Sequence, residues 1–212
     1  MNQAYIISGT RTPIGNFGGI LSSIRPDDMA AHVISELIKL NPNLDTNAIG
    51  EVILGCANQA GEDNRNVARM ALLLAGLPIT IPGETINRLC ASGMSAIVHA
   101  KRAINCSDSE IIIAGGVESM TRAPYVMSKS AKPFGTDSAL YDSSFGWRFI
   151  NPKMQHLFGC DAMGVTAENL AELYKISRDD QDKFAFWSQQ KATNAQQSGQ
   201  FAPEISDRKS VV

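Results

Sequence analysis

The chain has 212 residues, a formal net charge of −2 and a hydrophobic fraction of 44%, which is enough for one large or two small domains with a sizeable core. Acidic and basic residues are interspersed, so neither nucleic acid nor a membrane is expected as a partner. No apolar run approaches the roughly 18 residues of a membrane-spanning helix, and the first residues do not resemble a signal peptide, so we expect a cytoplasmic protein.

The cysteines are few and far apart along the chain. They are Cys56, Cys90, Cys106 and Cys160, and none forms a C-x-x-C pair. This spacing argues against a structural zinc site and against a disulfide framework, and it fits a reducing compartment. We therefore expect no metal site.

The first half of the chain alternates between strand and helix patterns. We expect strands at residues 5–8, 51–54, 83–86 and 110–114, and helices at 66–75, from the Cys90 turn to about 105, and up to Leu40 from a cap at Asp27 or Asp28. Apolar strands alternating with helices predict an α/β layer with helices on both faces. The helix after Cys90 is apolar on most of its surface, so we expect it to be buried.

The character of the sequence changes after Gly116. Residues 120–151 are rich in Pro, Gly and Ser and predict long loops without a sheet, whereas 163–174 and a segment from Ser177 to Gly199 predict helices. We therefore expect a domain at 1–117 and a loop subdomain at 118–206. Residues 207–212 match one reading frame of a common sequencing adapter, so we expect an artefactual tail and a biological chain that continues.

Cys90 stands where a strand pattern gives way to a helix pattern. Unpaired N–H groups at a helix start favour a thiolate, which is the reactive form of cysteine. Gly93 and the small residues near it would let another backbone approach closely. The alternative is a cysteine that only fills space, because free cysteines are commonly buried, and position alone favours that alternative.

A helix start is not sufficient to make a nucleophile. A helix start stabilises a nearby negative charge by about 0.3–1 kcal/mol. This is less than the roughly 1.4 kcal/mol that changes a protonation equilibrium tenfold. A base is therefore also required. His99 cannot be that base, because nine residues along the same helix place it roughly half a turn out of phase and about 13 Å away along the axis.

Several longer stretches resemble the thiolases, the acetyl-CoA C-acyltransferases, in the right order along the chain. Asn87–Gly93 is similar to the nucleophile motif of the family, and Gly115–Arg122 to its second signature. Further matches are Arg11–Pro13, Gln59–Gly61, Asn66–Arg69 and Thr166–Asn169. The resemblance runs from Ala4 to about Ile205 and reverses the preference for a space-filling Cys90.

The resemblance implies the N-terminal half of a thiolase-like fold, a layered α-β-α arrangement with an inserted, mostly helical and loop-rich subdomain. It implies that Cys90 accepts the acyl group of a 3-oxoacyl-CoA as a thioester and that its N–H belongs to an oxyanion hole. Acyl-CoA and CoA are then substrates, no cofactor is expected, and the protein is a homo-oligomer, a dimer or a tetramer. Cys56, Cys106 and Cys160 match no catalytic position of the family, so we interpret them as packing residues. The activating His of a Gly-His-Pro motif and the second Cys of a Cys-x-Gly-x-Gly motif have no match here, so we expect this chain alone to be inactive.

Two segments resemble the branch that acts on 3-oxoadipyl-CoA. They are Gly55–Asn66 and Gly146–Pro152, and Ala162 before Met163 fits the same branch, whereas Gly164-Val165 departs from it. The resemblance implies that Met163 lines the acyl pocket, although Met is also a common gap filler. Arg148 is a candidate for binding the distal carboxylate of the acyl chain, the alternative being an ion pair with a loop carboxylate such as Asp142.

Three other functions stay open at this point. A general short-chain acetyl-CoA acetyltransferase would share the nucleophile. A non-catalytic module could bind acyl-CoA or dimerise without chemistry. A redox-active cysteine protein is disfavoured, because no resolving cysteine lies near Cys90 in the sequence.

Overall fold

The computed structural model describes residues 3–206, so the expected tail at 207–212 lies outside the described residues. The described chain divides into two compact units. Unit 1 comprises residues 3–124 together with 204–206, and unit 2 comprises Tyr125–Pro203. The expected division after Val117 stays a prediction. No helix among the described residues is both long and apolar enough to cross a membrane.

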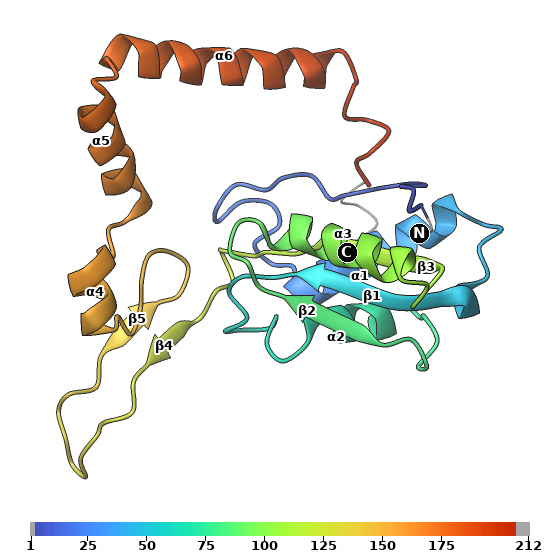
Figure 1. Ribbon diagram of the computed structural model, residues 1–212, viewed down its shortest axis with the longest axis horizontal. Helices are drawn as coiled ribbons and strands as arrows, with labels where there is room; N and C mark the ends of the chain where they lie inside the picture. Colours follow the sequence, from blue (N-terminus) through green and yellow to red (C-terminus); the bar gives the residue numbers. More distant parts are fainter. Residues whose placement is uncertain (1–2, 207–212) are drawn as a thin grey trace. The chain divides into compact units, whose positions relative to one another are not determined.

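Unit 1 is built on a three-stranded parallel sheet (Figure 1). Its strands are β1 (Ile49–Gly55), β2 (Gly83–Ile86) and β3 (Ile111–Gly116), in the order β2-β1-β3. The short 3₁₀ turn η1 (Thr46–Ala48) leads into β1. At the carboxyl end of the sheet, Gly55 lies opposite Ile86 on one side and Gly116 on the other. Because β1 is the central strand, its apolar residues 52–55 are all buried.

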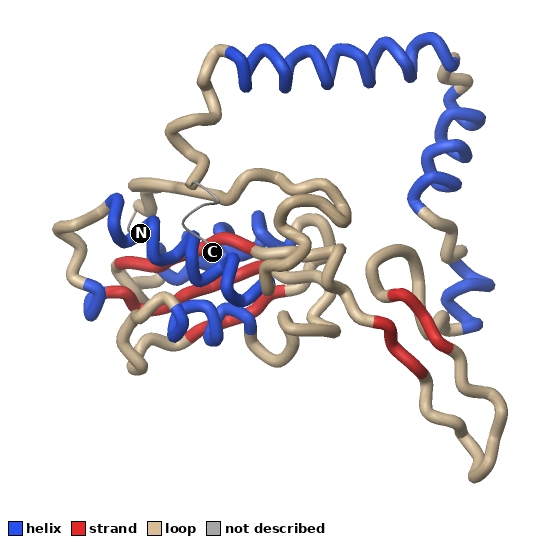
Figure 2. The backbone as a smooth tube through the Cα atoms, turned by 180° about the vertical axis from the view of Figure 1, so that it is seen from behind, coloured by secondary structure: helices blue, strands red, loops and turns tan. Residues whose placement is uncertain are grey.

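Helices cover both faces of this sheet, which confirms the predicted layered α/β arrangement (Figure 2). Val52 and Leu54 point into a core shared with α1 (Pro26–Leu40) and α2 (Val67–Leu74). Ile53 points the other way and packs against α3 (Ser92–Asn105). Alternate residues of one strand thus serve two cores, because successive side chains of a strand point to opposite faces.

Helix α1 begins two or three residues earlier than predicted. Its N-cap is Arg25, which makes no side-chain cap, and Pro26 occupies the first turn. Proline fits there because it lacks an N–H group that would need a partner. Asp27 is buried and accepts two hydrogen bonds from the Arg25 guanidinium, at 2.9 and 2.8 Å. The predicted cap at Asp27 or Asp28 is therefore wrong.

The predicted strand at residues 5–8 is also wrong in this structure. Ile6 and Ile7 are 84% and 83% exposed, and the segment is extended without forming a ladder. The only pairing recorded near it among the described residues is an isolated parallel bridge between Arg11 and Ile205, beside an ion pair of 2.8 Å from Arg11 to Glu204. A β-branched run has strand propensity, but a strand requires a partner along its length.

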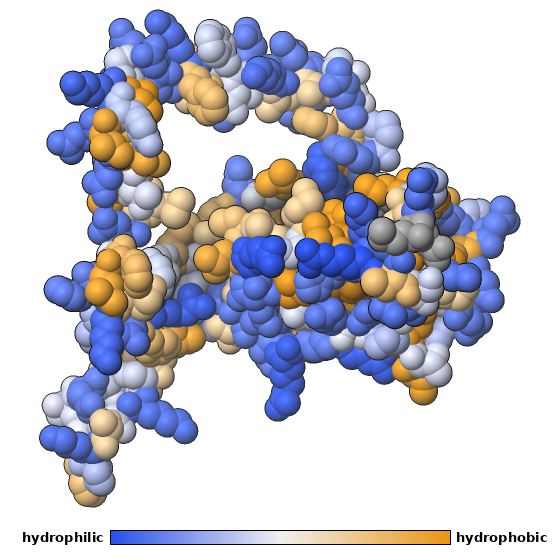
Figure 3. Space-filling view, in the orientation of Figure 1, coloured by the Kyte–Doolittle hydropathy of each residue, from blue (hydrophilic) through white to orange (hydrophobic). Residues whose placement is uncertain are grey.

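Helix α3 is half-buried, whereas its composition predicted full burial. Ser92, Ser95, Ala96 and Ala100 face the sheet, while Met94 and Ile97 are 65% and 40% exposed. The space-filling view shows hydrophobic side chains on this face of unit 1, over α3 (Figure 3). The buried stripe consists of small residues, so the helix backbone lies close to the sheet.

Unit 2 contains a short hairpin followed by three helices. Its strands are β4 (Tyr125–Met127) and β5 (Leu140–Asp142), paired antiparallel, so the expectation of loops without a sheet is wrong there. The helices are α4 (Pro152–Phe158), α5 (Met163–Tyr174) and α6 (Arg178–Gln197). Helices α5 and α6 are confirmed, and Ser177 caps α6 by accepting from the Asp180 N–H.

Candidate active site

Cys90 lies in a five-residue turn between β2 and α3. Strand β2 ends at Ile86 and α3 begins at Ser92, and the cysteine side chain is exposed. The turn is thus at the carboxyl end of the parallel sheet, where open α/β sheets commonly place their ligand sites. Cys90 lies two residues before the first helical residue, close to the unpaired N–H groups of α3.

Side chains on both sides of Cys90 fix the conformation of the turn. Leu89 has φ of +50°, in the left-handed region that leucine rarely adopts. Its N–H donates to Asn87 Oδ1 at 2.9 Å, an Asx turn. Ser92 Oγ accepts from the Arg88 N–H at 2.8 Å and donates to the Leu89 carbonyl at 2.6 Å. The strained backbone is therefore held from both ends, as is common at functional sites.

Glycines allow α3 to start directly against the strand ends. A Cβ on Gly55 would lie 2.3 Å from the Ser92 carbonyl carbon and 2.4 Å from the Gly93 nitrogen. A Cβ on Gly116 would lie 2.9 Å from the Gly55 carbonyl oxygen and 3.5 Å from Gly93 Cα. The expected close approach of another backbone to Gly93 is therefore confirmed, and it determines where the Cys90 turn sits.

The loop after β1 contacts the same turn. The Asn87 side-chain amide donates to the Ala57 carbonyl at 2.9 Å. The Ala57 and Asn58 N–H groups donate to the two carboxylate oxygens of Glu118, at 2.8 and 3.2 Å. Sequence reasoning missed the roles of Asn87, Ser92 and Glu118. The Asx turn at Asn87 had a signal, since Asn side chains commonly hydrogen-bond the backbone two residues further along the chain.

Cys56, Asp63 and Glu118 form a cluster whose potential ligand atoms lie within 4.8 Å of one another. Burial, together with the Glu118 and Asp63 carboxylates, raises the pKa of the Cys56 thiol to about 12. The thiol donates to Asp63 Oδ2 at 3.5 Å, and Asp63 Oδ1 accepts from the Gly61 N–H at 3.0 Å. A metal would require a thiolate, so this donor set fits a structural hydrogen-bond network rather than a metal site.

The other cysteines differ in exposure. Cys56 is 1% exposed, as expected of a packing residue, and Cys160 is half-buried. Cys106 is exposed at the C-cap of α3, so packing does not account for it. Exposure alone therefore does not single out Cys90, and the turn that surrounds it is the distinguishing feature.

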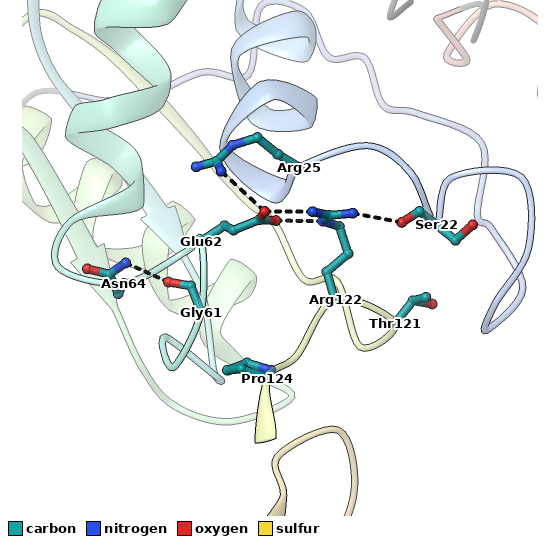
Figure 4. A pocket seen from close by; sticks show the side chains of 8 residues that line it. All are labelled: Ser22, Arg25, Gly61, Glu62, Asn64, Thr121, Arg122 and Pro124. Carbon is teal, nitrogen blue, oxygen red and sulfur yellow. Dashed lines mark hydrogen bonds and ion pairs between the residues drawn. The ribbon is translucent and has the colours of Figure 1, made fainter. Parts of the chain in front are cut away.

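A hollow of about 530 Å³ in unit 1 is lined by charged residues (Figure 4). Glu62 bridges Arg122 and Arg25, with nitrogen–oxygen distances of 2.5 and 3.2 Å. The hydrogen bond from Arg122 is the largest cause of a lowered pKa at Glu62. Arg25 also pairs with Asp27, so two cations face two carboxylates. This balance does not favour an anion, and the cluster acts as a brace between the start of α1 and the segment at 121–124.

The other two predicted site residues belong to unit 2. Met163 is the first residue of α5 and is 81% exposed. Arg148 is half-buried and donates to the Ser143 carbonyl at 3.4 Å, while Asp142 accepts from the Ser144 N–H at 2.8 Å. Cys90 lies in unit 1, and the roles of Met163 and Arg148 stay predictions.

Comparisons with a family description and with individual proteins point to the same family. The family description "Thiolase, N-terminal domain" matches residues 4–211. The 3-oxoadipyl-CoA/3-oxo-5,6-dehydrosuberyl-CoA thiolase of Escherichia coli (strain K12) is 59% identical over 97% of this chain and 51% of its own length. The beta-ketoadipyl-CoA thiolase of Pseudomonas aeruginosa is 58% identical over 96% and 51%. The chain thus spans about half the length of the curated relatives it matches.

A solved structure agrees with this assignment. The crystal structure of the Bacillus anthracis acetyl-CoA acetyltransferase superposes with a TM-score of 0.81 at 36% identity, covering 93% of this chain and 48% of that one. The chain therefore belongs to the thiolase family and corresponds to its N-terminal domain.

Proposed function

We propose that the protein containing this chain is a thiolase that cleaves 3-oxoadipyl-CoA with CoA, and that Cys90 is its acyl-accepting nucleophile. The observation that carries the proposal is the exposed Cys90 on a turn held in a strained conformation by Asn87 and Ser92, at the start of α3. The names of the relatives from Escherichia coli and Pseudomonas aeruginosa support the substrate.

The proposed reaction has two balanced steps. The Cys90 thiolate attacks C3 of the 3-oxoacyl-CoA, and the bond between C2 and C3 then breaks. The departing carbanion of acetyl-CoA takes up a proton, while a succinyl thioester remains on Cys90. The thiolate of a second CoA attacks this thioester, a succinyl-CoA forms, and the Cys90 thiolate leaves.

Each residue of this chain has a limited part in those steps. The N–H of Cys90 is proposed as one oxyanion donor, and losing one such donor in other enzymes costs on the order of 10²–10³ in rate. Met163 is proposed to line the acyl pocket, and Arg148 to bind the distal carboxylate. The base that removes the thiol proton is proposed to be the family's Gly-His-Pro histidine, which has no match here. CoA is a substrate, and no cofactor is proposed.

The cellular compartment, the oligomeric state and the partners are also proposals. A cytoplasmic homo-oligomer without nucleic-acid or membrane partners is consistent with the interspersed charges and the absence of paired cysteines in the sequence.

A second candidate is a general short-chain acetyl-CoA acetyltransferase. The structural match to the Bacillus anthracis acetyl-CoA acetyltransferase favours it, although that protein is less similar in sequence, at 36% identity. The two candidates share Cys90 and differ in whether a cation recognises the far end of the acyl chain. A dicarboxylic substrate needs such a cation, because a buried unpaired carboxylate is costly.

The test uses a chimera in which residues 1–206 are followed by the C-terminal half of the Escherichia coli relative. Cys90→Ala should abolish thiolysis, while Cys106→Ala, which also removes an exposed thiol, should leave it unchanged. Arg148→Ala should lower kcat/KM for 3-oxoadipyl-CoA much more than for acetoacetyl-CoA. The control Arg178→Ala removes an exposed arginine of the same unit.

The outcomes separate the candidates. Equal loss with both substrates in Arg148→Ala would favour the general acetyltransferase. Activity retained in Cys90→Ala would reject the nucleophile. Binding of acyl-CoA without turnover by the unsubstituted chimera would favour the non-catalytic module.

A further inference from the structure

Glu118 lies just beyond the end of β3 and uses its carboxylate to hold the loop that follows β1. One oxygen accepts from the Ala57 N–H at 2.8 Å and the other from the Asn58 N–H at 3.2 Å. Glu118 is anchored to the sheet through its neighbour, because the Val117 N–H donates to the Gly55 carbonyl at 3.0 Å. Hydrogen bonds to a carboxylate are roughly twice as strong as neutral ones, so two consecutive amides are pinned by one side chain.

The pinned loop passes this constraint to the Cys90 turn. The carbonyl of Ala57 accepts from the Asn87 side-chain amide at 2.9 Å. The other end of that amide, Oδ1, accepts from the Leu89 N–H at 2.9 Å. Leu89 is the residue with φ of +50°, and Cys90 follows it directly. An unbroken series of hydrogen bonds thus runs from Glu118 through Ala57 and Asn87 to Leu89.

We propose that Glu118 is a positioning residue for Cys90. It touches no reactant. It fixes the Ala57 carbonyl, which orients the Asn87 amide so that its oxygen faces the Leu89 N–H and its nitrogen faces the loop. This orientation stabilises the left-handed Leu89 that sets the direction of the Cys90 side chain. The inference rests on the proposed function only in that the reaction at Cys90 is the process being positioned.

The arrangement explains why a charged residue is needed at this place. Two adjacent N–H groups converge on Glu118, and a carboxylate offers an acceptor to each. An amide side chain would offer one acceptor and one donor, and the donor would face an N–H group. Glu118→Gln is therefore a nearly isosteric change that breaks one of the two contacts and weakens the hold on the loop at Ala57 and Asn58.

The first measurement is amide hydrogen exchange of this chain. In Glu118→Gln, exchange at Leu89 and Cys90 should become at least fivefold faster, while exchange in α1 and α2 stays unchanged. The control is Glu110→Gln, which neutralises an exposed glutamate just before the start of β3. It should leave exchange at Leu89 and Cys90 unchanged. Unchanged exchange at Leu89 and Cys90 in Glu118→Gln would overturn the proposal.

A second variant interrupts the same series at another point. Asn87→Ser removes the side-chain amide that joins Ala57 to Leu89, and it should accelerate exchange at Leu89 even if Glu118→Gln proves too unstable to study. Combined with Glu118→Gln, it should add little further acceleration, because both changes break one series of contacts. Multiplication of the two accelerations would show independent effects and contradict the proposal, as would normal exchange in Asn87→Ser.

Activity of the chimera gives a readout that general destabilisation does not reproduce. Glu118→Gln should lower kcat for thiolysis at least tenfold with little change in KM, at temperatures where its unfolding is negligible. Equal kcat in Glu118→Gln and Glu110→Gln would reject the positioning role. If the unsubstituted chimera has no thiolase activity, the proposed function fails, while hydrogen exchange at Leu89 and Cys90 still decides the role of Glu118.

Discussion

The contact between Gly55 and the start of α3 makes a quantitative prediction about the variant Gly55→Ala. The added Cβ would lie 2.3 Å from the Ser92 carbonyl carbon, 2.4 Å from the Gly93 nitrogen and 2.6 Å from the Ser92 oxygen. These are backbone atoms of the first turn of α3, so no side-chain rotation can relieve the clash. The turn must retreat by about 1 Å to reach ordinary van der Waals contact.

Two effects of opposite sign determine the change in stability. Alanine restricts the unfolded chain and stabilises the fold by about 0.4–1 kcal/mol where its backbone fits. Overpacking a core costs about 1–3 kcal/mol, occasionally more, and a clash with backbone should be at the upper end. We expect Gly55→Ala to lower the free energy of unfolding of unit 1 by about 2–3 kcal/mol.

Hydrogen exchange of the β1 amides measures this free energy, because the amides of a central strand exchange through global opening. The control is Gly115→Ala, whose Cβ would lie 3.6 Å from Leu54 Cδ2 and meet nothing closer. Gly115 lies opposite Leu54, the residue before Gly55 in β1, and Gly115→Ala should change stability by less than about 1 kcal/mol. Equal stability of Gly55→Ala and the unsubstituted chain, or an equal loss in both variants, would refute the packing argument.

Three further predictions concern cysteines and carboxylates. Cys90 should react with limiting iodoacetamide before Cys106, because Cys90 lies close to the unpaired N–H groups at the start of α3, whereas Cys106 lies at the C-cap of that helix. Peptide mapping decides this, and labelling of Cys106 first would contradict the prediction. Burial raises the pKa of Cys56 to about 12, so the folded state holds its proton more tightly. Stability should fall as pH rises above about 9, by up to about 1.4 kcal/mol per pH unit, and Cys56→Ala should flatten this decline in a pH series of urea unfolding. The Arg122 contact lowers the pKa of Glu62 below 4.5, so stability present above that pH should be lost as the pH falls; Glu62→Gln should flatten the acid limb, and an unchanged limb would exclude the brace.

The layered core was predictable because its signals are local. The apolar runs in β1 and β3 are long enough to indicate buried strands, and the helical segments between them are mostly apolar. The segment 5–8 has the same local signal but makes no ladder, since pairing depends on which other strand is available. The predicted acidic cap of α1 was wrong because Pro26 already occupies the first turn of the helix. The buried Asp27 forms an ion pair with Arg25 instead of capping the helix.

The candidate site was predictable only in part. Cys90 could be found from its motif and from the transition between strand and helix. The role of Glu118 could not, because it depends on the loop after β1 meeting a residue 61 positions further along the chain. The exposure of Met94 and Ile97 was missed for a similar reason: composition reports how apolar a helix is, but not which of its faces meets the sheet.

The most direct test of the central claim is to trap the acyl group on the protein. The chimera is incubated with 3-oxoadipyl-CoA in the absence of free CoA, quenched in acid and examined by peptide mass spectrometry. Residues 1–206 alone serve as the control and should acquire no acyl group, because the family's activating histidine has no match in them. We predict a single succinyl thioester on the peptide that contains Cys90, and its disappearance when CoA is added. Thiolysis without an adduct on Cys90, or an adduct on Cys106 or Cys160 instead, would contradict the account.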